Sequence, residues 1–142
     1  LRELDQNIII ASYGAKYASS FYGPFRNTLG GSNVIDKSSY QIDIRNSNQA
    51  ISEIENDIKQ GADLIIVKPG MPYLDIIQRA SHEFRTPIIA YQVSGEYFSI
   101  KTSIENKILQ NSTWTESISC FKRAGAKAII TYGVFDFYNS LK

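Results

Sequence analysis

Two lysines, Lys16 and Lys68, stand where a parallel α/β protein places its reactive groups. Lys68 directly follows the apolar run Leu64–Val67, and Lys16 follows the first apolar run. The carboxyl ends of parallel strands carry the chemistry of such proteins. Burial lowers the pKa of a lysine, and a neutral amine can attack a ketone or aldehyde to form a Schiff base. Either lysine alone is explained as well by a side chain that extends from a strand end into solvent. Together, each lowering the other's pKa by repulsion, they favour carbonyl chemistry.

Hydroxyl and cationic side chains near the same rim suit a carboxylate-bearing substrate. Ser94 follows the third apolar run and Tyr132 ends the fourth, whereas Arg26 and Lys37 precede Gln41 in a long irregular segment. A guanidinium binds a carboxylate through two parallel hydrogen bonds. The alternatives are a helix N-cap for Ser94, core packing for Tyr132 and solvated loop charges for the cations. The whole set suits a small keto acid.

The elements that must position these residues alternate between two types. Continuous β-branched runs at residues 8–11, 64–67, 88–91 and 128–132 predict strands that are covered on both faces. Apolar residues at helical spacing between them predict helices near residues 50–58, 74–84 and 118–124. Strands that alternate with helices indicate βα units around a parallel sheet. Residues 19–40 show no such pattern and are predicted to form an active-site lid, with an ordinary surface loop as the alternative.

Composition excludes several other classes. The chain has 142 residues, 43% of them hydrophobic, and a net charge of +1, so neither disorder nor nucleic-acid binding through bulk positive charge is expected. No apolar run approaches the roughly 18 residues that span a bilayer. The only histidine, His82, and the only cysteine, Cys120, cannot form a catalytic triad or a cysteine cluster for zinc. We expect a chain without nucleic-acid or membrane partners, in the cytoplasm.

Four segments that contain these residues resemble those of a known family. They are Ser12–Arg26 (SYGAKYASSFYGPFR), Val67–Ile76 (VKPGMPYLDI), Tyr91–Tyr97 (YQVSGEY) and Ile130–Tyr132 (ITY). In order and spacing they resemble the active-site segments of porphobilinogen synthase, also called δ-aminolevulinic acid dehydratase. The resemblance extends over essentially the whole chain.

The resemblance implies a lyase that condenses two molecules of 5-aminolevulinate into porphobilinogen, with loss of water, in tetrapyrrole and haem synthesis. It implies that Lys68 forms the Schiff base with the first substrate and that Lys16 helps bind the second. The other implied roles are carboxylate binding by Ser94 and Tyr132 for the first substrate, carboxylate binding by Arg26, Lys37 and Gln41 for the second, and an aromatic wall from Tyr22 and Phe25.

The resemblance also implies a larger assembly. Family members are (β/α)₈ (TIM) barrels of about twice this length that form homo-octamers, so residues 1–142 are predicted to be the C-terminal half of such a barrel. The metal-binding segment for Zn²⁺ or Mg²⁺ would then lie in the half that is not present, and the chain alone would be inactive. Glu53 matches a position that binds an allosteric Mg²⁺ in some members, with an ordinary exposed glutamate as the alternative.

The chain departs from the family pattern at three places, and its sequence is also compatible with two other functions. The family usually has serine at Gly14 and arginine at Lys37, and the segment from Gly30 to Asp36 is slightly shorter. The other functions are a different Schiff-base lyase or aldolase on a TIM barrel, which needs only one imine-forming lysine, and a non-catalytic remnant of the enzyme.

Overall fold

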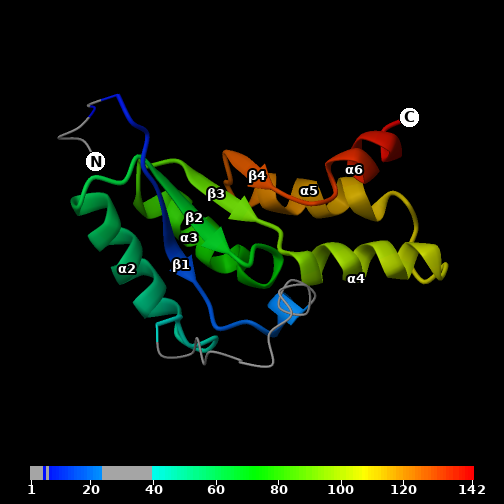
Figure 1. The fold of residues 1–142 in the computed structure, drawn as a ribbon, viewed down its shortest axis with the longest axis horizontal. Helices are drawn as coiled ribbons and strands as arrows, with labels where there is room; N and C mark the ends of the chain where they lie inside the picture. Colours follow the sequence, from blue (N-terminus) through cyan, green and yellow to red (C-terminus); the bar gives the residue numbers. More distant parts are fainter. Residues whose placement is uncertain (1–4, 6, 24–39) are drawn as a thin grey trace.

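The four strands of the described chain form one parallel sheet. The computed structural model describes residues 5, 7–23 and 40–142, with β1 at Ala11–Lys16, β2 at Leu64–Lys68, β3 at Ile88–Tyr91 and β4 at Ala128–Ile130. The strands lie in the sheet in chain order, β1-β2-β3-β4 (Figure 1). An order that never reverses is that of a (β/α)₈ barrel wall, because a doubly wound sheet reverses at a switch point. The α/β prediction is confirmed, and the sheet is part of a barrel.

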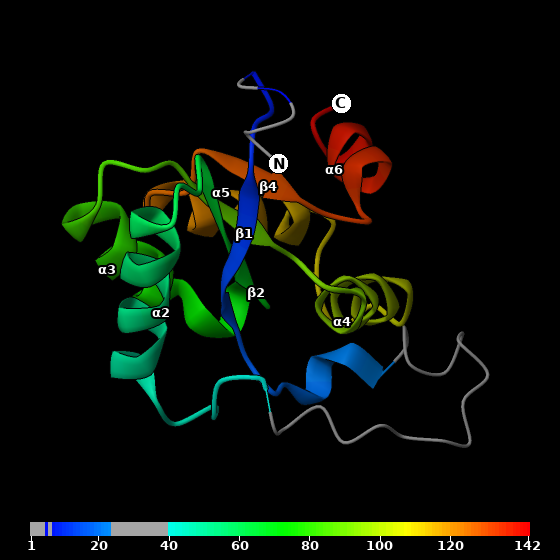
Figure 2. The same ribbon diagram turned by 60° about the vertical axis from the view of Figure 1, so that its left-hand side comes forward.

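One face of this sheet is covered by a layer of helices. The layer consists of α2 (Ser47–Lys59), α3 (Leu74–Glu83) and α5 (Thr113–Arg123), each packed against its neighbour. Figure 2 shows α2 and α3 together on one side of β1 and β2. This arrangement is expected when each helix connects two adjacent parallel strands.

The core lies between the helices and the sheet. Ile54 of α2, Ile65 of β2, Ile77 of α3 and Phe121 of α5 are all completely buried. Burying side chains of this kind contributes roughly 1.5–3 kcal/mol each relative to exposure. The apolar spacing read from the sequence therefore does face the sheet. No helix in the described residues combines the length and the hydropathy needed to cross a bilayer.

Glycine ends two of the helices. Gly61 after α2 and Gly125 after α5 have φ of 96° and 104°. Only glycine adopts this conformation without a steric penalty, and it turns the chain from the helix into the next strand. A Cβ at Gly125 would also lie 2.6 Å from Cβ of Ser81 on α3.

Two further helices and two short turns lie near the carboxyl ends of the strands. They are α4 (Ser94–Glu105), α6 (Val134–Ser140), η1 (Ser20–Tyr22) and η3 (Met71–Tyr73). The sequence analysis missed α4 and α6. In α4 the apolar residues form no stripe, and its buried residues are all in its first turn, Ser94–Tyr97. In Figure 1, α4 extends away from the end of β3.

Two local predictions were wrong. The first strand begins at Ala11 rather than Ile8, because Ile10 bonds with the turn before β2: its amide donates to the Asp63 carboxylate and its carbonyl accepts from Asp63 and Leu64. The segment Thr113–Glu116 has the sequence form of a capping box, which predicts a helix start capped by Thr113, but this cap does not form. The residue before α5 is Ser112, which has helical backbone angles and makes no side-chain cap. Of the predicted lid, residues 24–39 lie outside the described residues.

Candidate active site

A bulge in β1 places Lys16 beside Lys68. Ser12 pairs with Ile65 and Ala15 with Val67, so three steps along β1 match two along β2. Gly14 and Ala15 therefore both face α2, and Lys16 returns to the face that Tyr13 occupies. Strict alternation from Tyr13 would have turned Lys16 towards the helices. Because Lys16 pairs directly with Lys68, the two lysines lie side by side, as the sequence analysis expected.

The Lys68 amine lies among three tyrosine rings. Its Nζ is 4.0 Å from the ring centre of Tyr91, 5.2 Å from that of Tyr13 and 5.8 Å from that of Tyr22. Tyr13 also lies 5.6 Å from Nζ of Lys16, so one ring is shared by the two lysines. Aromatic faces attract an ammonium ion, and they also hold the side chain in one place.

Two features of the site lower the pKa of Lys68. Burial lowers the pKa of Lys68, and the positive charge of Lys16 lowers it further. Burial, together with a hydrogen bond to Tyr132, raises the pKa of Tyr91 to about 12, so Tyr91 stays protonated at neutral pH. A half-buried amine with a depressed pKa is a suitable nucleophile for a carbonyl carbon.

A small cavity joins Lys68 to three other predicted site residues. It has a volume of about 50 Å³ and is lined by the following residues: Tyr22, Lys68, Tyr91, Val93, Ser94 and Tyr132. Oγ of Ser94 is buried and has no hydrogen-bond partner among the residues that the structure describes. Ser94 is also not the helix cap considered above, because α4 begins at Ser94 and Val93 is its N-cap. Buried hydroxyls in proteins normally have a hydrogen-bond partner, so an unpartnered one beside the Lys68 amine is suited to bind a ligand.

Tyr22 is held over Lys68 by η1. The Tyr22 hydroxyl donates to the Lys68 carbonyl at 3.1 Å, and Ser19 caps η1 by accepting from the Phe21 amide. η1 itself rests on α4 at Gly95, where an added Cβ would lie 2.2 Å from the Phe21 carbonyl oxygen. Glycine at this position therefore allows the contact that brings Tyr22 to the cavity.

Tyr132 follows β4 in a segment that a buried polar network fixes. The side-chain amide of Gln92 donates to Ser117 at 2.9 Å, and its oxygen accepts from the Thr131 hydroxyl at 2.5 Å. That hydroxyl in turn accepts from the Gly133 amide, so the residues on both sides of Tyr132 are held. The Tyr132 side chain is exposed, which does not support the core-packing alternative.

Gln41 lies on the Lys16 side of the site and not in the Lys68 cavity. The next residue, Ile42, pairs with β1 through its amide, which donates to the Lys16 carbonyl at 2.9 Å. Gln41 is buried, and its Oε1 has no hydrogen-bond partner in the described part of the chain. It lines a separate cavity of about 380 Å³ with Asp43 and Arg45 among others. The structure thus separates the predicted residues into a group around Lys68 and a group near Lys16.

Some predicted residues are not joined to this site. Phe25, Arg26 and Lys37 lie outside the described residues. Glu53 is exposed on α2, and the described residues contain no group of three or more His, Cys, Asp and Glu side chains that could hold a metal. Gly14 faces Ile54 and Asp57, so a serine hydroxyl there would point towards α2 and away from the lysines.

Three residues of the site were missed by the sequence analysis. Tyr13 and Tyr91 both face Lys68, and the rule that selected Tyr132, a tyrosine at a strand end, could also have selected Tyr91. Glu96 is buried in the first turn of α4 and accepts hydrogen bonds from the loop after Lys68. Nothing in the local sequence indicates that contact, because its partners are 25 and 26 residues away.

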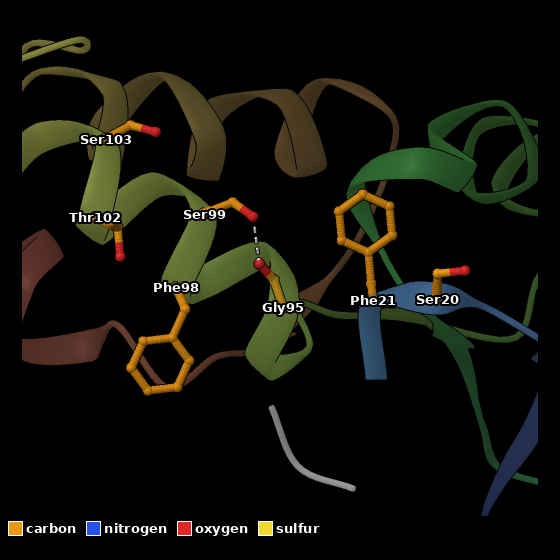
Figure 3. Close-up of a pocket in the computed structure, with 7 residues that line it drawn as sticks. All are labelled: Ser20, Phe21, Gly95, Phe98, Ser99, Thr102 and Ser103. Atoms are coloured by element: carbon orange, nitrogen blue, oxygen red, sulfur yellow. Dashed lines mark hydrogen bonds between the residues drawn. The ribbon is translucent and has the colours of Figure 1, made fainter. Parts of the chain in front are cut away.

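A larger cavity lies next to this site but lacks its chemistry. It has a volume of about 570 Å³ and lies between η1 and α4 (Figure 3). It is lined by hydroxyl side chains, two phenylalanines and Gly95: Ser20, Phe21, Gly95, Phe98, Ser99, Thr102 and Ser103. None of these groups can act as an amine nucleophile or a base near neutral pH, so the reactive centre remains at Lys68.

Comparisons with known proteins identify the family of this chain. The family model for delta-aminolevulinic acid dehydratase matches residues 2–139. The enzyme of that name from Bradyrhizobium diazoefficiens is 46% identical over 129 residues, and that from Archaeoglobus fulgidus is 51% identical over 124 residues. These alignments cover 89% and 87% of this chain, and 36% and 38% of the relatives. Relatives from Glycine max and Pisum sativum carry the same name with the word chloroplastic.

A solved structure of the same family closely matches the fold of this chain. Porphobilinogen synthase from Toxoplasma gondii, in complex with the reaction product porphobilinogen, superposes with a TM-score of 0.89 at 40% sequence identity. The match covers 99% of this chain and 40% of that protein, so the chain spans about two fifths of the length of its relatives. On the match of nearly all its residues, the chain belongs to the delta-aminolevulinic acid dehydratase family.

Proposed function

We propose that the protein containing this chain is a porphobilinogen synthase, a lyase that joins two molecules of 5-aminolevulinate with loss of two waters. The observation that carries the proposal is the cavity that Lys68, the tyrosines Tyr22, Tyr91 and Tyr132, and the buried Ser94 line together, with no partner for the Ser94 hydroxyl among the described residues. The name of the family and the product complex of the Toxoplasma gondii relative support the same reaction.

In this proposal Lys68 and Ser94 act on the two ends of the first substrate. Nζ of Lys68 forms a bond to the keto carbon of 5-aminolevulinate, and the carbonyl oxygen leaves as water after it gains protons. The carboxylate accepts hydrogen bonds from the hydroxyls of Ser94 and Tyr132, which line the same cavity. Tyr22 and Tyr91 provide the aromatic wall around the imine, and burial keeps a fraction of Lys68 neutral before the attack.

The second substrate is assigned to the Lys16 side. Lys16 lies beside Lys68, and Gln41 directly precedes Ile42, whose amide donates to the Lys16 carbonyl. We assign Arg26, Lys37 and Gln41 to the second carboxylate, and Phe25 to the aromatic wall, from the resemblance of the sequence alone. A second lysine beside the first favours the two-substrate reaction over an aldolase, which needs one imine.

Borohydride trapping tests the assignment. Borohydride reduces an imine to a stable secondary amine, so the intact protein incubated with 5-aminolevulinate and borohydride should carry the adduct at Lys68 on peptide mapping. Lys68→Arg keeps the charge and should abolish both the adduct and porphobilinogen formation, whereas Lys122→Arg, at an exposed site on α5, should change neither. An adduct at another lysine, or none, would refute the role of Lys68.

We further propose that residues 1–142 alone form little porphobilinogen. Complete small-ligand pockets have about 300–1,000 Å³, and the cavity at Lys68 has about 50 Å³. The sheet also has two edge strands, β1 and β4, among the described residues, where a closed barrel has none. Normal turnover by the isolated chain would contradict this, and inactivity of the intact protein as well would favour the non-catalytic remnant.

The metal, assembly and location proposals rest on the family resemblance. For Mg²⁺ at Glu53 the fit is poor, because that carboxylate is exposed and the described residues bring no cluster of metal-binding side chains to it. We therefore derive no step through a metal. A homo-octamer is tested by light scattering of the intact protein, and a cytoplasmic location by cell fractionation, with a plastid as the alternative because some relatives are chloroplastic.

A further inference from the structure

Glu96 is a buried carboxylate that backbone amides surround. Its side chain lies in the first turn of α4, the residue is 4% exposed, and it forms no ion pair with a described lysine or arginine. Three backbone N–H groups donate to it: Val93 at 2.6 Å, Met71 at 2.6 Å and Gly70 at 3.3 Å. The bond from Val93 caps α4 at its own N-terminus. The bonds from Gly70 and Met71 come from the loop that follows Lys68.

One carboxylate thus joins the ends of two strands. Oε2 accepts from Gly70 and from Val93, and Oε1 accepts from Met71. Gly70 is two residues after Lys68, and Val93 is directly before Ser94. The amine that would attack the keto carbon and the hydroxyl that would hold the carboxylate therefore sit on backbone segments that Glu96 ties together.

The packing around the two segments leaves little other freedom. A Cβ at Gly70 would lie 2.5 Å from the Phe121 ring, and one at Gly95 would lie 2.2 Å from the Phe21 carbonyl oxygen. Both close contacts hold the loops in van der Waals contact with their neighbours. Glu96 supplies the polar link between them that packing alone does not provide.

We propose that Glu96 is a positioning residue, which sets the distance between the Lys68 amine and the Ser94 hydroxyl so that both ends of one keto acid bind at once. This inference rests on the proposed function. Glu96 touches neither reacting atom in this scheme, and it acts through the backbone on either side of the cavity. Misplacement of a reacting group by about 1 Å can lower a rate by about 100-fold, so a link of this kind has a measurable effect.

The cost of burying Glu96 supports a role beyond stability. Burial raises the pKa of Glu96 from 4.5 to about 7, although the three N–H donors oppose the rise. Folding therefore binds a proton between those two values, and the stability of the protein falls as the pH rises through that window. Among the ionisable side chains nearby, Tyr73 is affected by the charge of Glu96, which contributes to raising the pKa of Tyr73. Groups that are costly to the fold in this way are found often at functional sites.

The test compares a substrate that has the carboxylate with one that lacks it. In the intact protein, the rate of borohydride-trapped imine formation at Lys68 is measured with 5-aminolevulinate and with aminoacetone, which has the same aminomethyl ketone without the carboxylate arm. We call the rate with 5-aminolevulinate divided by the rate with aminoacetone the rate ratio. It reports how well the Lys68 amine and the carboxylate-binding hydroxyl are aligned. The fraction of protein that is folded affects both rates equally and cancels from the ratio.

Glu96→Gln keeps the size of the side chain but offers only one acceptor oxygen to the three amides. We expect it to lower the rate ratio by about 10- to 100-fold, with aminoacetone trapped at nearly the rate of the unchanged protein. Glu96→Asp keeps the charge but is one methylene shorter, and it should also lower the ratio. Glu105→Gln, at an exposed position on the same helix, should leave the ratio unchanged.

The outcomes separate the inference from the proposed function. Equal losses with both ketones, or an unchanged ratio in both Glu96 variants, would overturn the positioning role while leaving the Schiff base in place. Failure of both variants to fold would make Glu96 a residue of the fold alone and would overturn it too. No adduct at Lys68 in the unchanged protein would instead overturn the proposed function.

Discussion

The two faces of the sheet differ sharply. The face towards α2, α3 and α5 is closed, with Ile65, Val67 and Ala90 at 0% exposure. The opposite face, which we call the open face, contains the two lysines and leaves apolar side chains in solvent: Tyr13 is 47% exposed and Ile130 39%. Exposed apolar surface of this kind is typical of a face that contacts another part of a protein, a partner or a ligand. The face towards the helices, which we call the helix face, contains the core that stabilises the fold. The open face contains the reactive lysines and is not covered by helices of the described residues.

The largest expected effect separates the two faces by stability. Ile65→Ala in the intact protein should lower the free energy of unfolding by about 2–5 kcal/mol, because it removes atoms from a filled core. If the open face is the interior of a barrel, Ile130→Ala should cost a similar amount in the intact protein. Chemical denaturation of both variants measures this, with Ile108→Ala at an exposed site as the control. A cost below about 0.5 kcal/mol for Ile130→Ala would show that the open face stays in water.

Substitution of Ser94, with Ser117 as the control, distinguishes an effect on substrate binding from an effect on stability. Ser94→Ala removes a buried hydroxyl that has no partner, so the unfolding free energy should stay the same or rise. Because a hydrogen bond to a charged group contributes about 1.5–3 kcal/mol, KM for 5-aminolevulinate should rise by about 10- to 150-fold.

The control is Ser117→Ala, which deprives the Gln92 amide of its partner. That variant should lose stability, and its KM should rise less than that of Ser94→Ala, because Ser117 acts on Tyr132 only through Gln92 and Thr131. The reverse pattern, with Ser94→Ala unstable and KM unchanged, would remove Ser94 from the substrate site.

A glycine at the junction of η1 and α4 tests how Tyr22 reaches the open face. Gly95→Ala places a methyl group against the Phe21 backbone, so η1 must move away from α4. We expect a loss of about 1–3 kcal/mol in stability, as for overpacking elsewhere, and slower imine formation because Tyr22 leaves Lys68. Gly23→Ala, where an added Cβ meets nothing within 4 Å, is the matched control. Similar trapping rates in both variants would argue against a role for η1.

The helix face was predictable from sequence to a degree that the open face was not. β-branched runs and apolar spacing indicated the strands and the three helices that cover them, because burial on both sides requires those patterns. The position of Lys16 depends on a bulge at Gly14 and Ala15. A glycine inside a strand is a general signal of a bulge, but it does not say which face the next side chains take. α4 was missed because only its first turn is buried, and Glu96 because its partners are distant backbone amides.

The smallest expected effect concerns the charge that the two lysines share on the open face. Lys16→Met removes the positive charge that lowers the pKa of Lys68, so that pKa should rise and the neutral amine should become scarcer at a given pH. The pH profile of imine formation at Lys68 should therefore move to higher pH, whereas Lys16→Arg, which keeps the charge, should leave it in place. Burial, the larger cause of the lowered pKa, is the same in both variants, so only part of the depression is lost. A profile that moves equally in both variants would show that Lys16 acts on Lys68 through its shape. A profile that moves in neither would show that burial by the tyrosine rings alone sets the reactivity of Lys68.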